Sequence, residues 1–199
     1  MKYPNSLQEL IEYFKLLPGI GEKNAERLAF AVLKFSDEQV DGFSESLKNV
    51  KTKIKKCEIC NNLTENDKCD ICLDQSRSSD VLCVVENTKN LILFEKANVF
   101  NGKYHVLEGL ISPLEGVNPE DIKINQLINR IKDEKIKEVI LALTPNIEGE
   151  TTSGYILKML EGYDVSVTKI AAGIPVGADM EYLDPLTIQM AMQGRNKLS

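Results

Sequence analysis

Residues 57–72 read CEICNNLTENDKCDIC, two matched Cys-x-x-Cys pairs with eight residues between them. Each pair can turn tightly enough to aim both thiolates at one point, and two such turns complete a tetrahedron around Zn²⁺. Four thiolate ligands leave no coordination position for water or substrate. The pattern therefore predicts one structural Zn²⁺ per chain, bound by Cys57, Cys60, Cys69 and Cys72.

Two disulfides, a thioredoxin-like redox pair and unrelated buried thiols are the alternatives for these cysteines. The chain opens MKYPNSLQEL, without the apolar signal segment that an oxidising compartment requires, and this disfavours disulfides. A redox pair does not need a matched second pair nearby. Runs such as 139–143 are strand length, so no membrane span is expected.

The composition describes a globular chain with an uneven charge. Of 199 residues, 43% are hydrophobic and 27% are charged, and the net charge is −6. Residues 1–56 carry ten Lys/Arg against eight Asp/Glu (+2), whereas residues 57–199 carry fourteen against twenty-two (−8). The segment 47–56 holds five lysines and no acid. This asymmetry suggests two surfaces with two functions, although the lysines alone also fit a solvated helix face.

The N-terminal region predicts two amphipathic helices, 7–16 and 25–33, with Ser6 capping the first. The turn between them reads Leu17-Pro-Gly-Ile-Gly-Glu-Lys23. Two helices joined in this way resemble the helix-hairpin-helix motif. Ile20 is expected to anchor the hairpin in its own core, and a plain αα-hairpin with a glycine turn is the alternative.

The hairpin turn has the chemistry of a phosphate site. Gly19 and Gly21 tolerate positive φ and place no Cβ between the backbone and a ligand, while the free N–H groups of the second helix favour an anion. Lys23 and Arg27 lie four residues apart and would flank the phosphate. We expect sequence-independent DNA binding, because phosphate carries no base identity. Further contacts are expected from the lysine-rich segment: Lys51, Lys53 and Lys55.

Beyond residue 80, short apolar strands alternate with helices. Strands are predicted at 81–85, 104–107, 137–143 and 165–170, and helices at 88–97, 118–134 and 151–161. This alternation predicts a parallel sheet covered on both faces. Cys83 is expected to be a small buried residue, and His105 to have a structural or interface role.

Acidic residues follow two of these strands, where parallel sheets place their sites. Glu86 and the later Gly149-Glu150 resemble parts of the Toprim domain of topoisomerases, primases and related nucleases. In that domain a strand-end Glu and an Asp-x-Asp ahead of Gly-Glu form a Mg²⁺ site. Thr144 and Asn146 occupy the Asp-x-Asp positions here, and neither carries the charge that Mg²⁺ needs. The Toprim fold is expected without its catalysis.

The order of these motifs resembles the bacterial RecR family of recombination mediators over nearly the full length. Ala172 and Ala178 depart from it, because the family usually has His and Gly there. The segments that carry the resemblance are 17–21, 57–72, 84–86, 111–116, 147–150 and 173–177.

The resemblance implies a cytoplasmic, nucleoid-associated and non-enzymatic protein that forms a ring homotetramer, a dimer of dimers. Proteins of this family bind single- and double-stranded DNA and act with RecO, and in some pathways RecF, to load RecA. The acidic edge formed by Glu86, Glu148 and Glu150 would then suit a basic protein partner rather than DNA.

The sequence predicts an α+β fold made of several parts. It comprises a helix-hairpin-helix domain (1–56), a four-cysteine zinc finger (57–72), a Toprim domain (80–176) and a C-terminal oligomerisation segment (177–199). A Mg²⁺-dependent Toprim nuclease or primase fragment is the competing enzyme, but it needs two metal carboxylates after Leu143 and none occurs before Glu148. A plain zinc-stabilised module is the third possibility, and it leaves Gly19, Gly21 and Lys23 without a purpose.

Overall fold

The computed structural model describes residues 3–171 and 173–195, so Ala172 lies outside the described residues. The chain divides into two compact units, Met1–Ile54 and Lys55–Ser199. The predicted boundaries at residues 56, 72 and 176 remain predictions from the sequence. In the part of the chain that is described, no helix is long and apolar enough to cross a membrane.

In its described residues, 3–54, the first unit contains three helices: α1 (Asn5–Lys15), α2 (Glu22–Val32) and α3 (Asp37–Thr52). Helices α1 and α2 pack through a small core of Leu7, Ile11, Ala25 and Ala29, with Ile20 partly buried against it as expected. The predicted cap at Ser6 is wrong. Helix α1 begins at Asn5, two residues earlier than predicted, because the Pro4 carbonyl accepts hydrogen bonds from the N–H groups of residues 7 and 8.

Helix α3 begins at a reciprocal cap. The Ser36 hydroxyl accepts from the Gln39 N–H at 3.3 Å, and the Gln39 side chain accepts from the Ser36 N–H at 3.0 Å. This capping box is readable from the sequence, since Ser-x-x-Gln precedes the helix. Helix α3 buries none of its side chains, and its last turns carry Lys48 and Lys51, in agreement with a solvated helix face.

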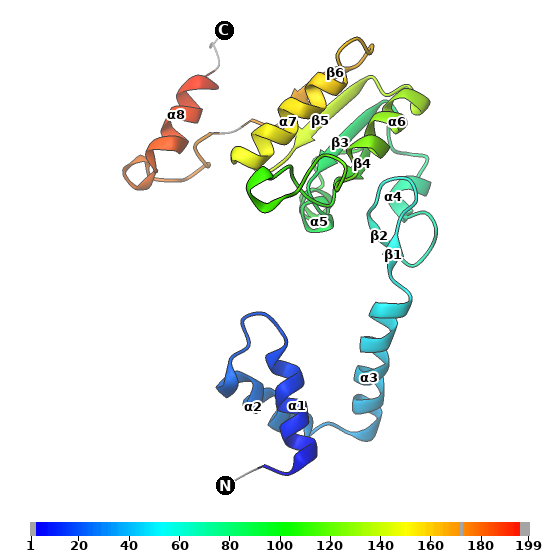
Figure 1. Ribbon diagram of the computed structural model, residues 1–199, viewed down its shortest axis with the longest axis vertical. Helices are drawn as coiled ribbons and strands as arrows, with labels where there is room; N and C mark the ends of the chain where they lie inside the picture. Colours follow the sequence, from blue (N-terminus) through cyan, green and yellow to red (C-terminus); the bar gives the residue numbers. More distant parts are fainter. Residues whose placement is uncertain (1–2, 172, 196–199) are drawn as a thin grey trace. The chain divides into compact units, whose positions relative to one another are not determined.

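The second unit is built on a four-stranded parallel sheet with the order β4-β3-β5-β6. The strands follow the predicted apolar runs: β3 (Val81–Val85), β4 (Lys103–Val106), β5 (Glu138–Ala142) and β6 (Ser166–Lys169). Three helices complete the alternation: α5 (Thr88–Ala97), α6 (Ile124–Glu134) and α7 (Ile147–Met159) (Figure 1). The Toprim architecture expected from the sequence is therefore present.

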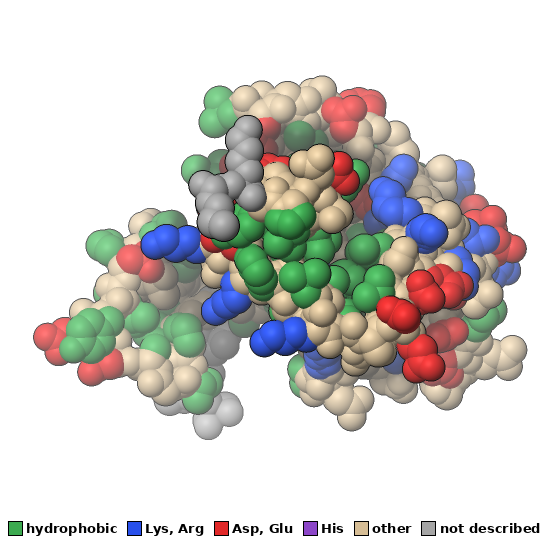
Figure 2. Space-filling model, turned by 90° about the horizontal axis from the view of Figure 1, so that it is seen from below, with side chains coloured by type: hydrophobic (Ala, Val, Ile, Leu, Met, Phe, Trp, Pro, Cys, Tyr) green, Lys and Arg blue, Asp and Glu red, His purple; other side chains and the backbone are tan. Residues whose placement is uncertain are grey.

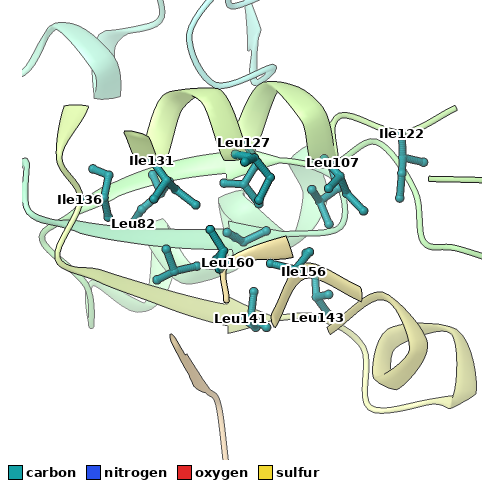
Figure 3. Close-up of a cluster of buried hydrophobic side chains, with 14 of the residues drawn as sticks. Leu82, Leu107, Ile122, Leu127, Ile131, Ile136, Leu141, Leu143, Ile156 and Leu160 are labelled. Carbon is teal, nitrogen blue, oxygen red and sulfur yellow. The ribbon is translucent and has the colours of Figure 1, made fainter. Parts of the chain in front are cut away.

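Both faces of the sheet are covered. The larger core joins β3 and β5 to α6 and α7 through residues that include Leu82, Leu127, Leu141 and Ile156 (Figure 3). On the other face, Leu91 of α5 packs with a second cluster that contains Cys83 and Tyr104. Cys83 is buried as predicted, and burial raises the pKa of its thiol to about 12.

His105 is fully buried in β4. Its Nε2 lies 3.1 Å from the carbonyl oxygen of Lys123, and Nδ1 has no hydrogen-bond partner among the described residues. Burial lowers the pKa of the imidazole to about 4. His105 is thus a neutral core residue, in agreement with a structural role.

Two helices begin at residues other than those predicted. Helix α6 begins at Ile124 rather than at Asn118, because the Lys123 N–H donates to the Leu107 carbonyl and holds this backbone at the end of β4. Helix α7 begins at Ile147 rather than at Thr151, because Asn146 caps it. Glu148 and Glu150 consequently lie in a helical first turn and not in a loop.

Short elements flank the sheet. Before it come β1 (Lys55–Lys56), β2 (Leu63–Thr64) and the one-turn helix α4 (Asp70–Leu73), and after it comes α8 (Pro185–Gln193). Gly177 has φ +82°, and the Ala178 N–H donates to the Pro175 carbonyl in the turn that leads towards α8. Ala178 is exposed.

Candidate metal centre and binding surfaces

The four predicted cysteines meet at one point. Their sulfur atoms all lie within 4.8 Å of one another, and Cys60 and Cys69 are 3.5 Å apart. Three of the four side chains are buried and Cys72 is half-buried. Sulfur atoms bound to tetrahedral Zn²⁺ at about 2.3 Å lie roughly 3.8 Å apart. The quartet fits one structural Zn²⁺.

The local backbone aims these sulfurs inward. Asn61 adopts φ +61°, and its N–H donates to the Cys57 carbonyl at 2.9 Å, which closes the first Cys-x-x-Cys turn. The Cys69 N–H donates to the Cys57 sulfur at 3.3 Å. Hydrogen bonds from Cys60 and then Cys72 lower the pKa of Cys69, whereas the bond to Cys69 raises that of Cys60. Zn²⁺ would bind these cysteines as thiolates and so release their protons.

The finger is attached to the edge strand of the sheet. The Val106 N–H donates to the Cys60 carbonyl at 2.8 Å, and the Asn61 amide donates to the Gln126 side chain at 2.9 Å. The Gln126 amide in turn donates to the Glu58 carbonyl at 2.8 Å. These bonds pair a backbone group of β4 that would otherwise lie at an open sheet edge.

Lys103 makes a second attachment. Its ammonium donates to the carbonyls of Ile71 at 2.8 Å, Cys72 at 3.2 Å and Asp74 at 2.5 Å. These carbonyls lie at the carboxyl end of α4, where a cation is favourable. The finger and the Toprim sheet are thereby parts of one unit.

The backbone of the hairpin turn bears on the anion site that the sequence predicts there. Gly19 has φ +81°, which favours glycine, whereas Gly21 is extended and precedes α2. Within the described chain, the N–H groups of Glu22 and Lys23 donate to no acceptor. Unpaired N–H groups at a helix N-terminus attract anions.

Charges around this turn favour an anion further. Lys23 and Arg27 are both exposed and lie four residues apart on α2, and neither forms an ion pair with a described residue. Glu22 would oppose a phosphate at this position, but the Lys15 ammonium lies 2.8 Å from its carboxylate. The negative charge of Glu22 in the first turn of α2 is therefore offset by Lys15.

The predicted lysines of segment 47–56 differ in their surroundings. Lys51 and Lys53 are exposed and form no ion pair with any residue that the structure describes. Lys55 pairs with Asp67, and Lys56 pairs with Glu108. Lys55 also belongs to the second unit, whereas the hairpin belongs to the first. Local sequence patterns carry no sign of these pairings, because the partners lie far along the chain.

The acidic edge of the sheet is held by neutral side chains. Glu86 directly follows β3, and the Thr144 hydroxyl donates to its carboxylate at 2.8 Å. Asn146 accepts from the Gly149 N–H at 2.8 Å and caps α7. A Cβ on Gly149 would lie 1.8 Å from the Thr144 carbonyl oxygen, so the close approach of α7 requires glycine.

The three predicted acids of this edge are not equivalent. The Glu150 carboxylate pairs with Lys169 at 2.9 Å through both oxygens. Glu148 is half-buried and has no ion-pair partner among the described residues. Within the described ranges, the cysteine quartet is the one group of three or more potential metal ligands gathered around a point. The structure does not bring Glu86, Glu148 and Glu150 together as such a group.

Four family models match consecutive parts of the chain. They are the RecR helix-hairpin-helix (residues 7–51), the RecR four-cysteine zinc finger domain (54–74), the Toprim domain (80–171) and the RecR C-terminal segment (173–196). Fold and site together define a Toprim protein that carries a structural zinc finger and a helix-hairpin-helix. The chain belongs to the RecR family. These domains support a role as a recombination mediator in DNA repair.

Proposed function

We propose that this protein binds single- and double-stranded DNA without sequence preference and acts with RecO, and with RecF, to load RecA on gapped or single-stranded DNA. It works as a ring homotetramer, a dimer of dimers, and performs no phosphoryl transfer itself. The unpaired N–H groups at the start of α2, beside Lys23 and Arg27, carry this proposal. They offer a phosphate both backbone donors and positive charge.

Exposed apolar side chains support the assembly. Figure 2 shows hydrophobic side chains gathered on the face of the molecule that is turned to the viewer. Patches of this kind mark protein interfaces. In the first unit the exposed large apolar residues include Tyr13, Leu16, Leu33, Leu47 and Val50, and in the C-terminal segment they include Val176, Tyr182 and Met192.

The acidic edge supports a protein partner. Glu86, Glu148 and Glu150 would repel phosphate, and a basic surface of RecO is the proposed contact. Charge reversal of Glu148 should weaken the complex, with the largest loss at low salt, where charge complementarity matters most. The isolated variant should still bind DNA, which separates this edge from the hairpin.

The lack of phosphoryl transfer is supported by the residues around Glu86. Thr144 and Asn146 offer neutral oxygens, and both are already engaged within the fold. Hard divalent cations bind tightly where several carboxylates converge. Any ion at this edge should bind weakly.

One experiment distinguishes a recombination mediator from a Toprim enzyme. Labelled single- and double-stranded DNA are mixed with the full chain, with and without Mg²⁺, and RecA filament formation is followed on DNA coated with single-strand-binding protein. We expect Mg²⁺-independent, salt-sensitive DNA binding and faster RecA loading when RecO is present. Strand cleavage or primer synthesis that disappears in Glu86→Ala would support the enzyme instead. If the chain neither binds DNA nor speeds RecA loading, the remaining interpretation is a structural module.

A further inference from the structure

A turn after β4 presents Leu114 to solvent. Leu114 is 99% exposed, and it lies in the 3-10 turn Pro113–Glu115. A single exposed leucine is ordinary, but a second aliphatic residue at the same edge of the sheet, Ile147, is 82% exposed in the first turn of α7. The neighbouring prolines, Pro113 and Pro145, are exposed as well.

The turn is held rigidly. Ser112 and Val117 exchange two backbone hydrogen bonds at 3.0 and 2.9 Å, and Gly116 closes the turn with φ +73°. Ile111 and Ser112, which precede the turn, are both buried. The backbone that carries Leu114 is thus fixed before any partner binds, so little backbone entropy is lost when Leu114 becomes buried.

A chain of hydrogen bonds joins this turn to the acidic edge. The Ile111 N–H donates to the Thr152 hydroxyl at 2.8 Å, and that hydroxyl donates to the Glu148 carbonyl at 2.7 Å. Thr152 is fully buried. The loop after β4 therefore reaches across the carboxyl end of β3 to α7, and Figure 1 shows it beside the first turn of that helix.

The charges of this edge are mostly negative. Glu115 sits on the turn itself, Glu148 has no ion-pair partner among the described residues, and Glu86 lies at the end of the strand between the two elements. The Glu150 carboxylate forms an ion pair with Lys169. The edge thus combines rigid aliphatic groups with carboxylates.

We propose that Leu114 and Ile147 are the apolar anchors of a docking surface, with Glu115 and Glu148 as its charged members. Its occupant is a basic protein surface that offers apolar pockets. Phosphate would be repelled by the carboxylates, and a second copy of residues 57–199 carries a net charge of −8, so charge complementarity favours a basic partner. This inference rests on the proposed contact between the acidic edge and RecO, and it names what supplies the affinity there.

The two kinds of side chain act on different rate constants. Rim charges mainly steer the encounter and set the salt dependence of association. Buried aliphatic anchors hold the formed complex and mainly affect dissociation. The proposal therefore predicts separate kinetic effects for the apolar and the acidic residues.

The test measures binding of RecO from the same organism to the immobilised full chain at several salt concentrations. Leu114→Ala and Ile147→Ala should each raise the dissociation rate constant, Leu114→Ala by at least about tenfold, with little change in association or salt dependence. Glu148→Lys should slow association, most strongly at low salt. Leu157→Ala is the matched control, because Leu157 is also exposed on α7 but lies about 15 Å further along the helix.

The outcomes separate this inference from the proposed function. Unchanged dissociation in both apolar variants, with weaker binding of Glu148→Lys, overturns the anchors but keeps the acidic contact. Unchanged binding in all three variants overturns the contact itself. A change in oligomeric mass of Leu114→Ala without RecO overturns the basic partner and assigns the surface to self-assembly. Because Leu114 makes almost no intramolecular contact, its substitution leaves the fold intact.

Discussion

The Thr144 hydroxyl donates a 2.8 Å hydrogen bond to the Glu86 carboxylate across the carboxyl ends of β3 and β5. In the Toprim enzymes that this edge resembles, a second carboxylate stands at the position of Thr144 and a metal ion lies between the two. Here a direct hydrogen bond joins the two residues. The bond engages one of the two Glu86 carboxylate oxygens.

Thr144→Asp tests this relationship. Two carboxylates within hydrogen-bond distance repel each other and raise the pKa of one of them, so the variant should lose roughly 1–2 kcal/mol of stability at pH 7. Added Mn²⁺ should restore part of the loss by binding between them. Urea unfolding with and without Mn²⁺ measures both effects, and Thr144→Ser, which keeps the hydroxyl, is the control. Full stability of Thr144→Asp without metal would contradict this account.

Loss of zinc should loosen the edge of the sheet as well as the finger. Structural zinc contributes on the order of 10 kcal/mol to the folding of small domains, and Cys57→Ser should lose one equivalent of metal. Because the Val106 N–H donates to the Cys60 carbonyl, hydrogen exchange at Val106 should accelerate in this variant. Metal analysis and exchange measurements check the two expectations. Unchanged exchange at Val106 would show that the finger folds independently of the sheet.

Lys23→Ala and Arg27→Ala should weaken DNA binding equally for all sequences. Each lost phosphate contact lowers the slope of log affinity against log salt by roughly one unit, multiplied by the number of subunits that touch the DNA. Gly21→Val should weaken binding without a change of charge, because a Cβ blocks the close approach. The structure offers no internal clash there, so the fold should survive.

A salt series for these three variants, with Lys158→Ala on α7 as the charge control, provides the measurement. If the salt slopes of Lys23→Ala and Arg27→Ala both equal that of the wild type, the DNA site lies elsewhere on the chain. Lys51 and Lys53 would then be the first residues to examine, since Lys55 is already paired with Asp67.

His105 should give the protein a pH dependence of its own. Burial lowers its pKa to about 4 from an ordinary value of 6.5, and the nearby Arg130 charge acts in the same direction. A pKa lower in the folded state means that the contribution is fully present above pH 6.5 and is lost as the pH falls towards 4. The loss is on the order of 2–3 kcal/mol. Unfolding free energies of wild type and His105→Gln across this range give the difference, and parallel curves would contradict the assignment.

Much of the fold could be predicted because its signals are local. The spacing of Cys57, Cys60, Cys69 and Cys72 is sufficient to define a metal quartet, since each pair folds within its own turn. The apolar run 81–85 became a strand with the predicted bounds, because a continuous apolar stretch is stable only when both its faces are buried. The capping box at Ser36 was equally readable and would have located α3.

Helix boundaries followed from contacts outside the periodic stretch of each helix. Helix α7 begins at Ile147 because the Asn146 side chain caps it and Gly149 lets its first turn approach the Thr144 carbonyl. Helix α6 begins only at Ile124 because the Lys123 N–H donates to the Leu107 carbonyl, 16 residues earlier, at the end of β4. Periodicity within the helix itself carries no record of them.

The sequence by itself determined which cysteines form the zinc quartet and where the strands run, because short-range spacing and burial pattern decide these features. Only the tertiary structure decided which charges remain available. It paired Lys55 with Asp67 and Glu150 with Lys169, tied Glu86 to Thr144, and left Glu148 beside an exposed Leu114 turn. These relationships join residues 12 to 58 positions apart, so they exist only after the sheet has brought the ends of its strands together.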